Sequence, residues 1–161
     1  GPVVDRWEGD RGEGPRGDTM TWLEKALACV KYVEAYCDED ARSAFRTRAR
    51  QIPSEIYYIG SAYAFAILAA RSSERDIYAG GSLEEKVKAI CGDRGKGREE
   101  KGYALYGACL LEAFRELGIP VNNLAETLKS LDERGALVDL ELAEYVDWLK
   151  KLAEAKFEAE R

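Results

Sequence analysis

Apolar residues recur every three or four positions along most of the chain, which is the period of an α-helix that buries one face. The first helix is predicted to begin at Thr21, because Thr21 and Glu24 match the capping-box pattern that satisfies free N–H groups at a helix start. The apolar positions that follow at helical spacing are Leu23, Leu27, Val30 and Val33. No segment shows the sustained alternation of a strand rich in β-branched residues, so the pattern predicts helices alone.

A second helix is predicted over residues 38–49, because its acidic start suits the N-terminal end of a helix dipole. Pro53 is expected to interrupt the chain, and a strongly apolar third helix is expected over residues 54–71. The core residues of this third helix are predicted to be Ile56, Ile59, Tyr63, Phe65 and Ile67. We interpret Gly60 as a position where the missing Cβ lets two helices pack closely.

The remaining pattern predicts four further helical segments. Ser82 and Glu85 form a second capping box, which opens a short helix that Gly92 ends. A long helix over residues 103–117 is expected to bury Tyr106, Leu110 and Phe114. A short helix capped by Asn122 or Asn123 follows, and the final helix is marked by Leu142, Val146, Leu149 and Ala153. We therefore predict an all-α fold, a compact single-domain bundle of about six or seven helices over residues 20–161.

Residues 1–19 are rich in Gly, Asp, Glu and Arg and offer almost nothing to bury, so they are interpreted as a flexible arm or an artificial tail. Within them, Gly12, Gly14 and Gly17 have the spacing of a dinucleotide-binding fingerprint. That fingerprint needs a preceding strand, which is not predicted here, and Pro15 lies inside it. We interpret the match as chance.

Charge is distributed unevenly along the chain, whose net charge is −6. Residues 42–101 hold 12 basic and 8 acidic side chains, whereas the segments on either side are acidic. Arg42, Arg46 and Arg50 are four residues apart and so form one stripe on a helix, with Arg48 to its side. Such a stripe suits a nucleic-acid backbone, because guanidinium groups pair with phosphates bidentately. The alternative is that the stripe pairs with Asp38–Asp40 or with a neighbouring acidic helix.

The glycine-rich basic loop over residues 92–98 is a second candidate phosphate contact, through Arg94, Lys96 and Arg98. It has the glycine spacing of a P-loop, but the Lys-Ser/Thr pair of that motif is missing and no strand leads into it. A solvated linker is the alternative interpretation. Arg71, at the end of the third predicted helix, completes the set of basic candidates.

Catalytic and metal sites are not expected. The chain has no histidine, which excludes Ser-His and Cys-His pairs and two-His metal sites. Glu141, Glu144 and Asp147 lack the Glu-x-x-His pattern of a di-metal bundle and are interpreted as a solvated acidic face. We expect no enzymatic activity, no metal and no cofactor.

The four cysteines are Cys29, Cys37, Cys91 and Cys109, and they contain no Cys-x-x-Cys pair. Cys29 and Cys37 would lie two turns apart on one helix, too far to bridge, so buried free thiols are the favoured interpretation. A disulfide involving Cys91 or Cys109 stays open. High charge with one Gln, two Asn, one Met and no His is typical of thermophile proteins. No apolar run is long enough to span a bilayer, and a cytoplasmic protein is expected.

A family resemblance rests on the segment from Arg46 to Arg71. It contains the basic run Arg46-x-Arg48-x-Arg50, then Pro53-x-x-Ile56, Gly60, Ala64-Phe65 and a closing Arg71. This order resembles the small helical subunit, subunit five, of the type III-B (Cmr) CRISPR–Cas effector complex. A charged glycine-bearing connection, a Tyr-rich helix and a closing helix with Trp148 follow in the same order. The chain departs from the family at Ile59 and Ser61, beside the glycine.

The resemblance implies a non-catalytic protein whose copies stack into a minor filament beside other Cmr subunits. It implies antiviral defence as the role, with guide RNA and target RNA held in the groove between filaments. Arg42, Arg46, Arg48, Arg50, Arg71, Arg94, Lys96 and Arg98 are then the candidate contacts to the RNA backbone. Two alternatives stay open: a free-standing helical DNA-binding regulator with residues 42–50 as its recognition helix, and a scaffold without nucleic-acid contact.

Overall fold

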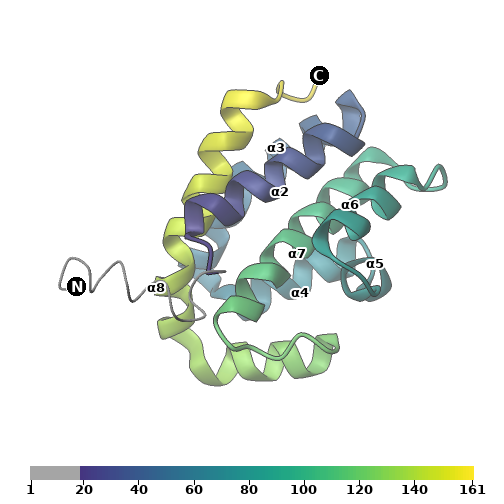
Figure 1. Cartoon of the computed structure of the whole chain (residues 1–161). Coiled ribbons are helices and arrows are strands. Elements are labelled where there is room, and N and C mark those ends of the chain that lie inside the picture. Colours follow the sequence, from purple (N-terminus) through teal and green to yellow (C-terminus); the bar gives the residue numbers. More distant parts are fainter. Residues whose placement is uncertain (1–18) are drawn as a thin grey trace, which may run out of the picture.

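Seven α-helices follow one another in the part of the chain that the structure, a computed structural model, describes, residues 19–161 (Figure 1). No strand occurs in this range, so the predicted all-α fold is confirmed. The expected arm, with its glycine pattern, lies outside the described residues except for Thr19. The helices are α2 (Trp22–Tyr36), α3 (Glu39–Ile59), α4 (Ser61–Arg71), α5 (Glu74–Tyr78), α6 (Leu83–Gly92), α7 (Arg98–Glu116) and α8 (Leu124–Lys156).

Side chains at four helix starts confirm where the sequence predicted these helices to begin. Thr21 caps α2 and Ser82 caps α6, each in a capping box closed by the glutamate three residues later. Asp38 caps α3 through the N–H of Ala41, at 2.9 Å, and Asn123 caps α8. Each cap supplies an acceptor for a backbone N–H that has no partner within the helix.

The expected break at Pro53 is wrong, because α3 continues through Pro53 to Ile59. Proline lacks the N–H that would bond to the carbonyl four residues earlier, which weakens a helix. Here Ile52 and Ile56 are both buried, at 0% and 5% exposure, so core packing on either side outweighs the lost hydrogen bond. The chain breaks instead at Gly60, whose φ of 87° and ψ of 158° are accessible essentially to glycine alone.

This break corrects two predictions. Ile59 and Tyr63 are exposed, at 46% and 61%, and Ile67 is only half-buried, whereas Phe65 lies in the core as predicted. Glycine is required at position 60 by the backbone conformation and not by close packing. A Cβ there would meet only the Asp139 carboxylate, at an ordinary 3.6 Å. The apolar pattern predicts one helix with one buried face. The turn at Gly60 instead divides the run between α3 and α4, which bury different faces.

Close helix packing does occur, but at Gly102 of α7. A Cβ on Gly102 would lie 2.9 Å from the Cβ of Ala44 and 3.0 Å from its carbonyl oxygen, so only glycine lets α7 lie this near α3. α7 is the central helix and also packs against α2, α4, α5 and α6. Tyr106, Leu110 and Phe114 are fully buried on it, as predicted, and the Phe114 ring contacts the Phe65 ring edge-on at 5.1 Å between centroids.

The last two predicted helices form one element, α8, which bends at Gly135 (φ 45°, ψ −122°). Its first part lies across the end of the bundle, and its later part runs beside α2 and α3 (Figure 1). Leu142, Val146, Leu149 and Ala153 are buried there, as the pattern predicted. Asp139 also caps α4 from a distance, because its Oδ1 accepts a hydrogen bond from the Ser61 N–H at 3.2 Å.

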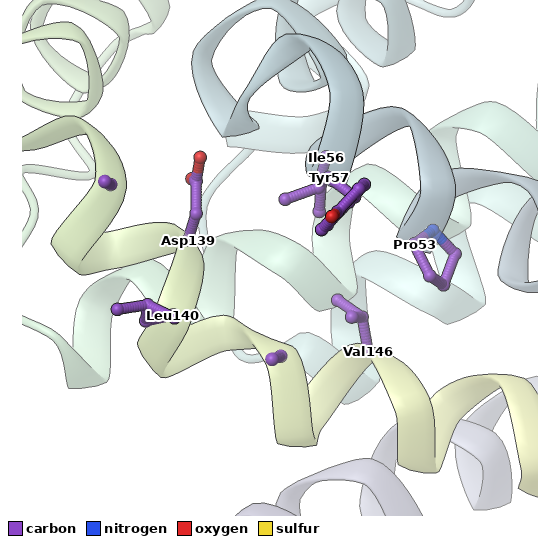
Figure 2. A pocket seen from close by; sticks show the side chains of 8 residues that line it. Pro53, Ile56, Tyr57, Asp139, Leu140 and Val146 are labelled. Carbon is purple, nitrogen blue, oxygen red and sulfur yellow. The ribbon is translucent and has the colours of Figure 1, made fainter.

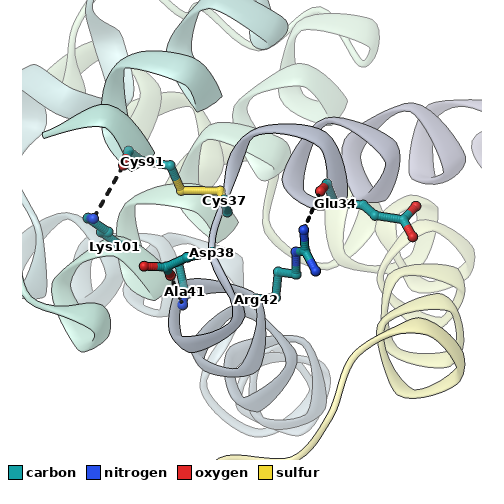
Figure 3. The surroundings of a disulfide bond; sticks show 7 residues. All are labelled: Glu34, Cys37, Asp38, Ala41, Arg42, Cys91 and Lys101. Atoms are coloured by element: carbon teal, nitrogen blue, oxygen red, sulfur yellow. Dashed lines mark hydrogen bonds between the residues drawn. A yellow bond between two sulfur atoms is a disulfide. The ribbon is translucent and has the colours of Figure 1, made fainter.

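The expectation of buried free thiols is wrong. Cys29 of α2 is bonded to Cys109 of α7, and Cys37, directly after α2, is bonded to Cys91 of α6 (Figure 3). Spacing correctly excluded a bridge between Cys29 and Cys37, but it could not show that α6 and α7 pack against α2. The two bonds tie α2 to α6 and α7 in the middle of the chain.

Candidate nucleic-acid interface

The arginine stripe of α3 lies where the sequence predicts, but both of its ends are engaged within the chain. The Arg42 side chain donates to the carbonyl of Glu34 at 2.8 Å (Figure 3), and Arg50 pairs with Glu154 of α8 at 2.7 Å. Arg46 is half-buried, and its Nε has no partner among the described residues. A recognition helix needs a face free to enter a DNA groove, so this arrangement disfavours the stripe as base-reading machinery.

The glycine-rich basic loop is folded back on the chain. The Lys96 ammonium lies 2.8 Å from Asp93 and 3.1 Å from Asp76 and is only 14% exposed. Hydrogen bonds to Asp93 and Asp76 raise the pKa of Lys96, and the same bond to Lys96 lowers the pKa of Asp93. Lys96 therefore holds the loop to α5. Asp93 also accepts a hydrogen bond from the Gly95 N–H, at 2.8 Å.

Two other basic candidates border this loop. Arg98 lies 3.7 Å from Asp40 at the start of α3, a weak and exposed ion pair. Arg94 is exposed and forms no ion pair with the described residues. Of the three loop candidates, Arg94 is thus the one whose charge is fully available to a phosphate.

Arg48 and Arg71 differ from the other arginines, because both lie against one aromatic ring. The guanidinium carbon of Arg48 is 4.4 Å from the centroid of the Tyr103 ring, and that of Arg71 is 5.7 Å from it. A guanidinium over a ring face is attracted by the negative face of the π system. The sequence identified both arginines but gave no sign that they meet, because Arg48 lies on α3, Arg71 on α4 and Tyr103 on α7.

Large apolar side chains are exposed at the end of α3, at the start of α4 and in the middle of α8, and sequence reasoning missed them. They are Tyr57, Tyr58, Ile59, Tyr63, Leu137 and Leu140, of which Tyr57 and Tyr58 are 81% and 79% exposed. We call this set the tyrosine surface. Large exposed apolar patches mark sites of protein association. The continuous apolar run offered one signal, because it holds more large side chains than one helix face can bury.

A groove of about 330 Å³ opens within the tyrosine surface (Figure 2). Pro53 and Tyr57 of α3 form one wall, and Leu140 and Val146 of α8 form the other. Asp139 is the charged residue in the lining of the groove. The lining is otherwise apolar, which suits a side chain of another protein better than a charged small molecule.

The described residues contain no group of three or more His, Cys, Asp or Glu side chains placed to hold a metal ion. Burial raises the pKa of both Tyr106 and Tyr145, further from the neutral range in which an acid–base group works best. The Tyr145 hydroxyl donates to the Cys109 carbonyl at 2.7 Å, a structural bond. Within residues 19–161, no helix is long and apolar enough to cross a membrane.

No protein-family model matches the chain, and no curated protein matches its sequence. In fold, the chain is similar to a chain of the type III-B Cmr-beta complex bound to non-cognate target RNA, seen by cryo-electron microscopy. The two superpose with a TM-score of 0.68 at 21% sequence identity, over 88% of this chain and 99% of that chain. At this identity the likeness shows a shared fold.

Proposed function

We propose that this chain is a non-catalytic small subunit of a type III-B Cmr ribonucleoprotein effector complex. In this role, copies of the chain stack into a minor filament and help to hold guide RNA paired with target RNA. The observation that carries the proposal is the fold likeness, which spans 99% of a chain from a complex of this type bound to target RNA. The order of basic, apolar and glycine positions from Arg46 to Arg71 supports it independently.

The exposed apolar surfaces support assembly with other chains. The tyrosine surface lies on α3, α4 and α8, whereas Met20 and Leu27, at 40% and 42% exposure, form a second apolar patch on and beside α2. Contacts between two different faces of identical subunits are head-to-tail and can extend into a filament. Tyrosine is also enriched among residues that dominate binding energy at protein interfaces.

The basic residues that have no carboxylate partner among the described residues support contact with an RNA backbone. Arg48, Arg71 and Arg94 form no ion pair with the described residues, although other arginines of the chain do. A backbone contact fits the division of labour in guided recognition, in which base pairing reads the sequence and protein contacts the strand. The engaged stripe of α3 weighs against the DNA-regulator alternative.

The test is purification of the tagged chain from its native cell, followed by native mass spectrometry and RNA sequencing. We expect several large partner subunits, more than one copy of this chain and a guide-length RNA. A lone monomer without RNA would contradict the proposal, and a chain found with proteins but without RNA would favour the scaffold. Sequence-specific binding of duplex DNA by the isolated chain would favour the regulator.

The stacking part of the proposal has its own test. Leu140→Asp places a charge on the groove of the tyrosine surface, where Leu140 is 73% exposed, so folding should be little affected. We expect fewer copies of the chain per complex by native mass spectrometry. Ala89→Asp adds the same charge to the exposed face of α6, away from the tyrosine surface, and serves as the control. Equal copy number in both variants would remove this surface from the stacking interface.

A further inference from the structure

The α3–α4 turn and α7 bring two arginines to one ring. Arg48 lies eleven residues before Ile59 on α3, and Arg71 ends α4, so the reversal at Gly60 returns the chain to the level of Arg48. With their guanidinium carbons 4.4 and 5.7 Å from the Tyr103 centroid, the two groups are at most about 10 Å apart. The close crossing at Gly102 holds Tyr103 against α3.

Among residues 19–161, no carboxylate forms an ion pair with either of these two cations, Arg48 and Arg71. Arg50 and Arg98 do form such pairs. Two like charges this close repel one another over about one Debye length, and the repulsion is relieved when an anion binds between or beside them. The arrangement is thus better suited to the bound state than to the free one.

The ring leaves the donors of both side chains available. A cation–π contact uses none of the N–H groups of a guanidinium, so these donors remain free for a bidentate contact with a phosphate. Tyr103 is only 7% exposed, so a nucleobase has little room to stack on its ring. The geometry therefore favours the phosphate backbone over the bases.

We infer that Arg48 and Arg71, held over Tyr103, form a binding site for the phosphodiester backbone of an RNA strand. The inference rests on the proposed function, which supplies RNA as the anionic partner, and it joins two of the eight basic candidates into one site. Arg42 and Arg50, already engaged by Glu34 and Glu154, contribute little. The contact is independent of base sequence, because it reaches phosphates alone.

The experiment is an NMR titration of the full-length chain with a single-stranded RNA of ten uridines at two salt concentrations. The Nε–H signals of Arg48 and Arg71 should shift, and those of Arg42 and Arg50 should not. In single strands each phosphate contact contributes about 0.7 to the log–log salt slope. A fourfold rise in salt should therefore weaken wild-type binding about sevenfold more than binding by Arg48→Ala/Arg71→Ala.

The matched control is Arg42→Ala/Arg50→Ala, which removes the same charge from the same region and should keep the wild-type slope. Equal thermal melting of wild type and Arg48→Ala/Arg71→Ala establishes that the loss is not unfolding. Equal slopes for the two double variants would overturn the inference while leaving the proposed function intact. No binding of the RNA by the wild type would overturn the inference, and shifts on adding an acidic peptide of ten glutamates would then favour a protein partner.

Discussion

Replacing Cys37 and Cys91 by alanine removes the bond between the end of α2 and the end of α6. That bond closes a loop with a sequence separation of 54, and in the chain-entropy account a loop of this length contributes about 4 kcal/mol by restricting the unfolded chain. The Cys29–Cys109 bond encloses it, with a separation of 80. Once the Cys37–Cys91 bond exists, the Cys29–Cys109 bond closes a smaller ring, made of the 8 residues from Cys29 to Cys37 and the 18 from Cys91 to Cys109. Its contribution to stability therefore falls to about 3.5 kcal/mol.

Together the two bonds contribute about 8 kcal/mol, which is comparable with the whole stability of a typical domain, about 5–15 kcal/mol. The assay is urea unfolding followed by circular dichroism at 222 nm. Oxidised wild type should have the highest midpoint, Cys37→Ala/Cys91→Ala a lower one, and wild type in reductant the lowest. Reduced wild type retains every side chain, so it separates the loss of the cross-links from the loss of cysteine packing.

A thiol count decides whether the premise is right. Wild type denatured without reductant should show no free thiol with Ellman's reagent, and four after reduction. Four reactive thiols before reduction would refute the disulfides themselves. Absence of free thiols with identical urea curves in the presence and absence of reductant would instead refute the loop-entropy reasoning.

Phe114→Ala should lower the free energy of unfolding by about 3–5 kcal/mol in urea, because the ring is fully buried; a loss below about 1 kcal/mol would mean that the core is not packed as described. Gly60→Ala should cost about 1–3 kcal/mol, because the backbone at φ 87° excludes side chains, and a neutral result in the same assay would contradict the break. Asp139→Ala removes the acceptor for Ser61 and should cost about 1 kcal/mol, with Asp139→Asn as the conservative control. Burial raises the pKa of Tyr78 to about 12 from 10.0. The stability that its neutral hydroxyl contributes to the fold is therefore full below pH 10 and is lost as the pH rises through 12. The melting temperature of Tyr78→Phe should therefore fall less than that of wild type between pH 9 and pH 11.5, and equal falls would contradict the shift.

Local signals in the sequence were sufficient for most of the fold. The capping boxes at Thr21 and Ser82 and the buried positions of α7 and of the end of α8 follow from spacing along one helix, which is local information. The predicted interruption at Pro53 is wrong, because burial of the residues around it outweighs the hydrogen bond that proline loses. That burial depends on α7 and α8, which are distant in the sequence.

The candidate site was predicted only in part for the same reason. Spacing placed Arg42, Arg46 and Arg50 on one side of a helix, but it could not supply their partners Glu34 and Glu154. It likewise could not bring Arg48 and Arg71 together, because their meeting depends on the reversal at Gly60 and on Tyr103. A helix face can be predicted from local spacing, whereas the groups that meet it depend on tertiary packing.

The bend at Gly135 divides α8 into two parts that are secured by different neighbours. Before it, Thr127 accepts a hydrogen bond from Tyr78 at 2.6 Å, and Arg134 donates to the Leu117 carbonyl at 3.0 Å. After it, the helix packs on α2 and α3. Amide hydrogens are released by local opening of cooperative units, and a non-helical residue interrupts cooperation along the backbone. What the ribbon draws as one helix of 33 residues should therefore exchange with deuterium as two units, each at its own rate.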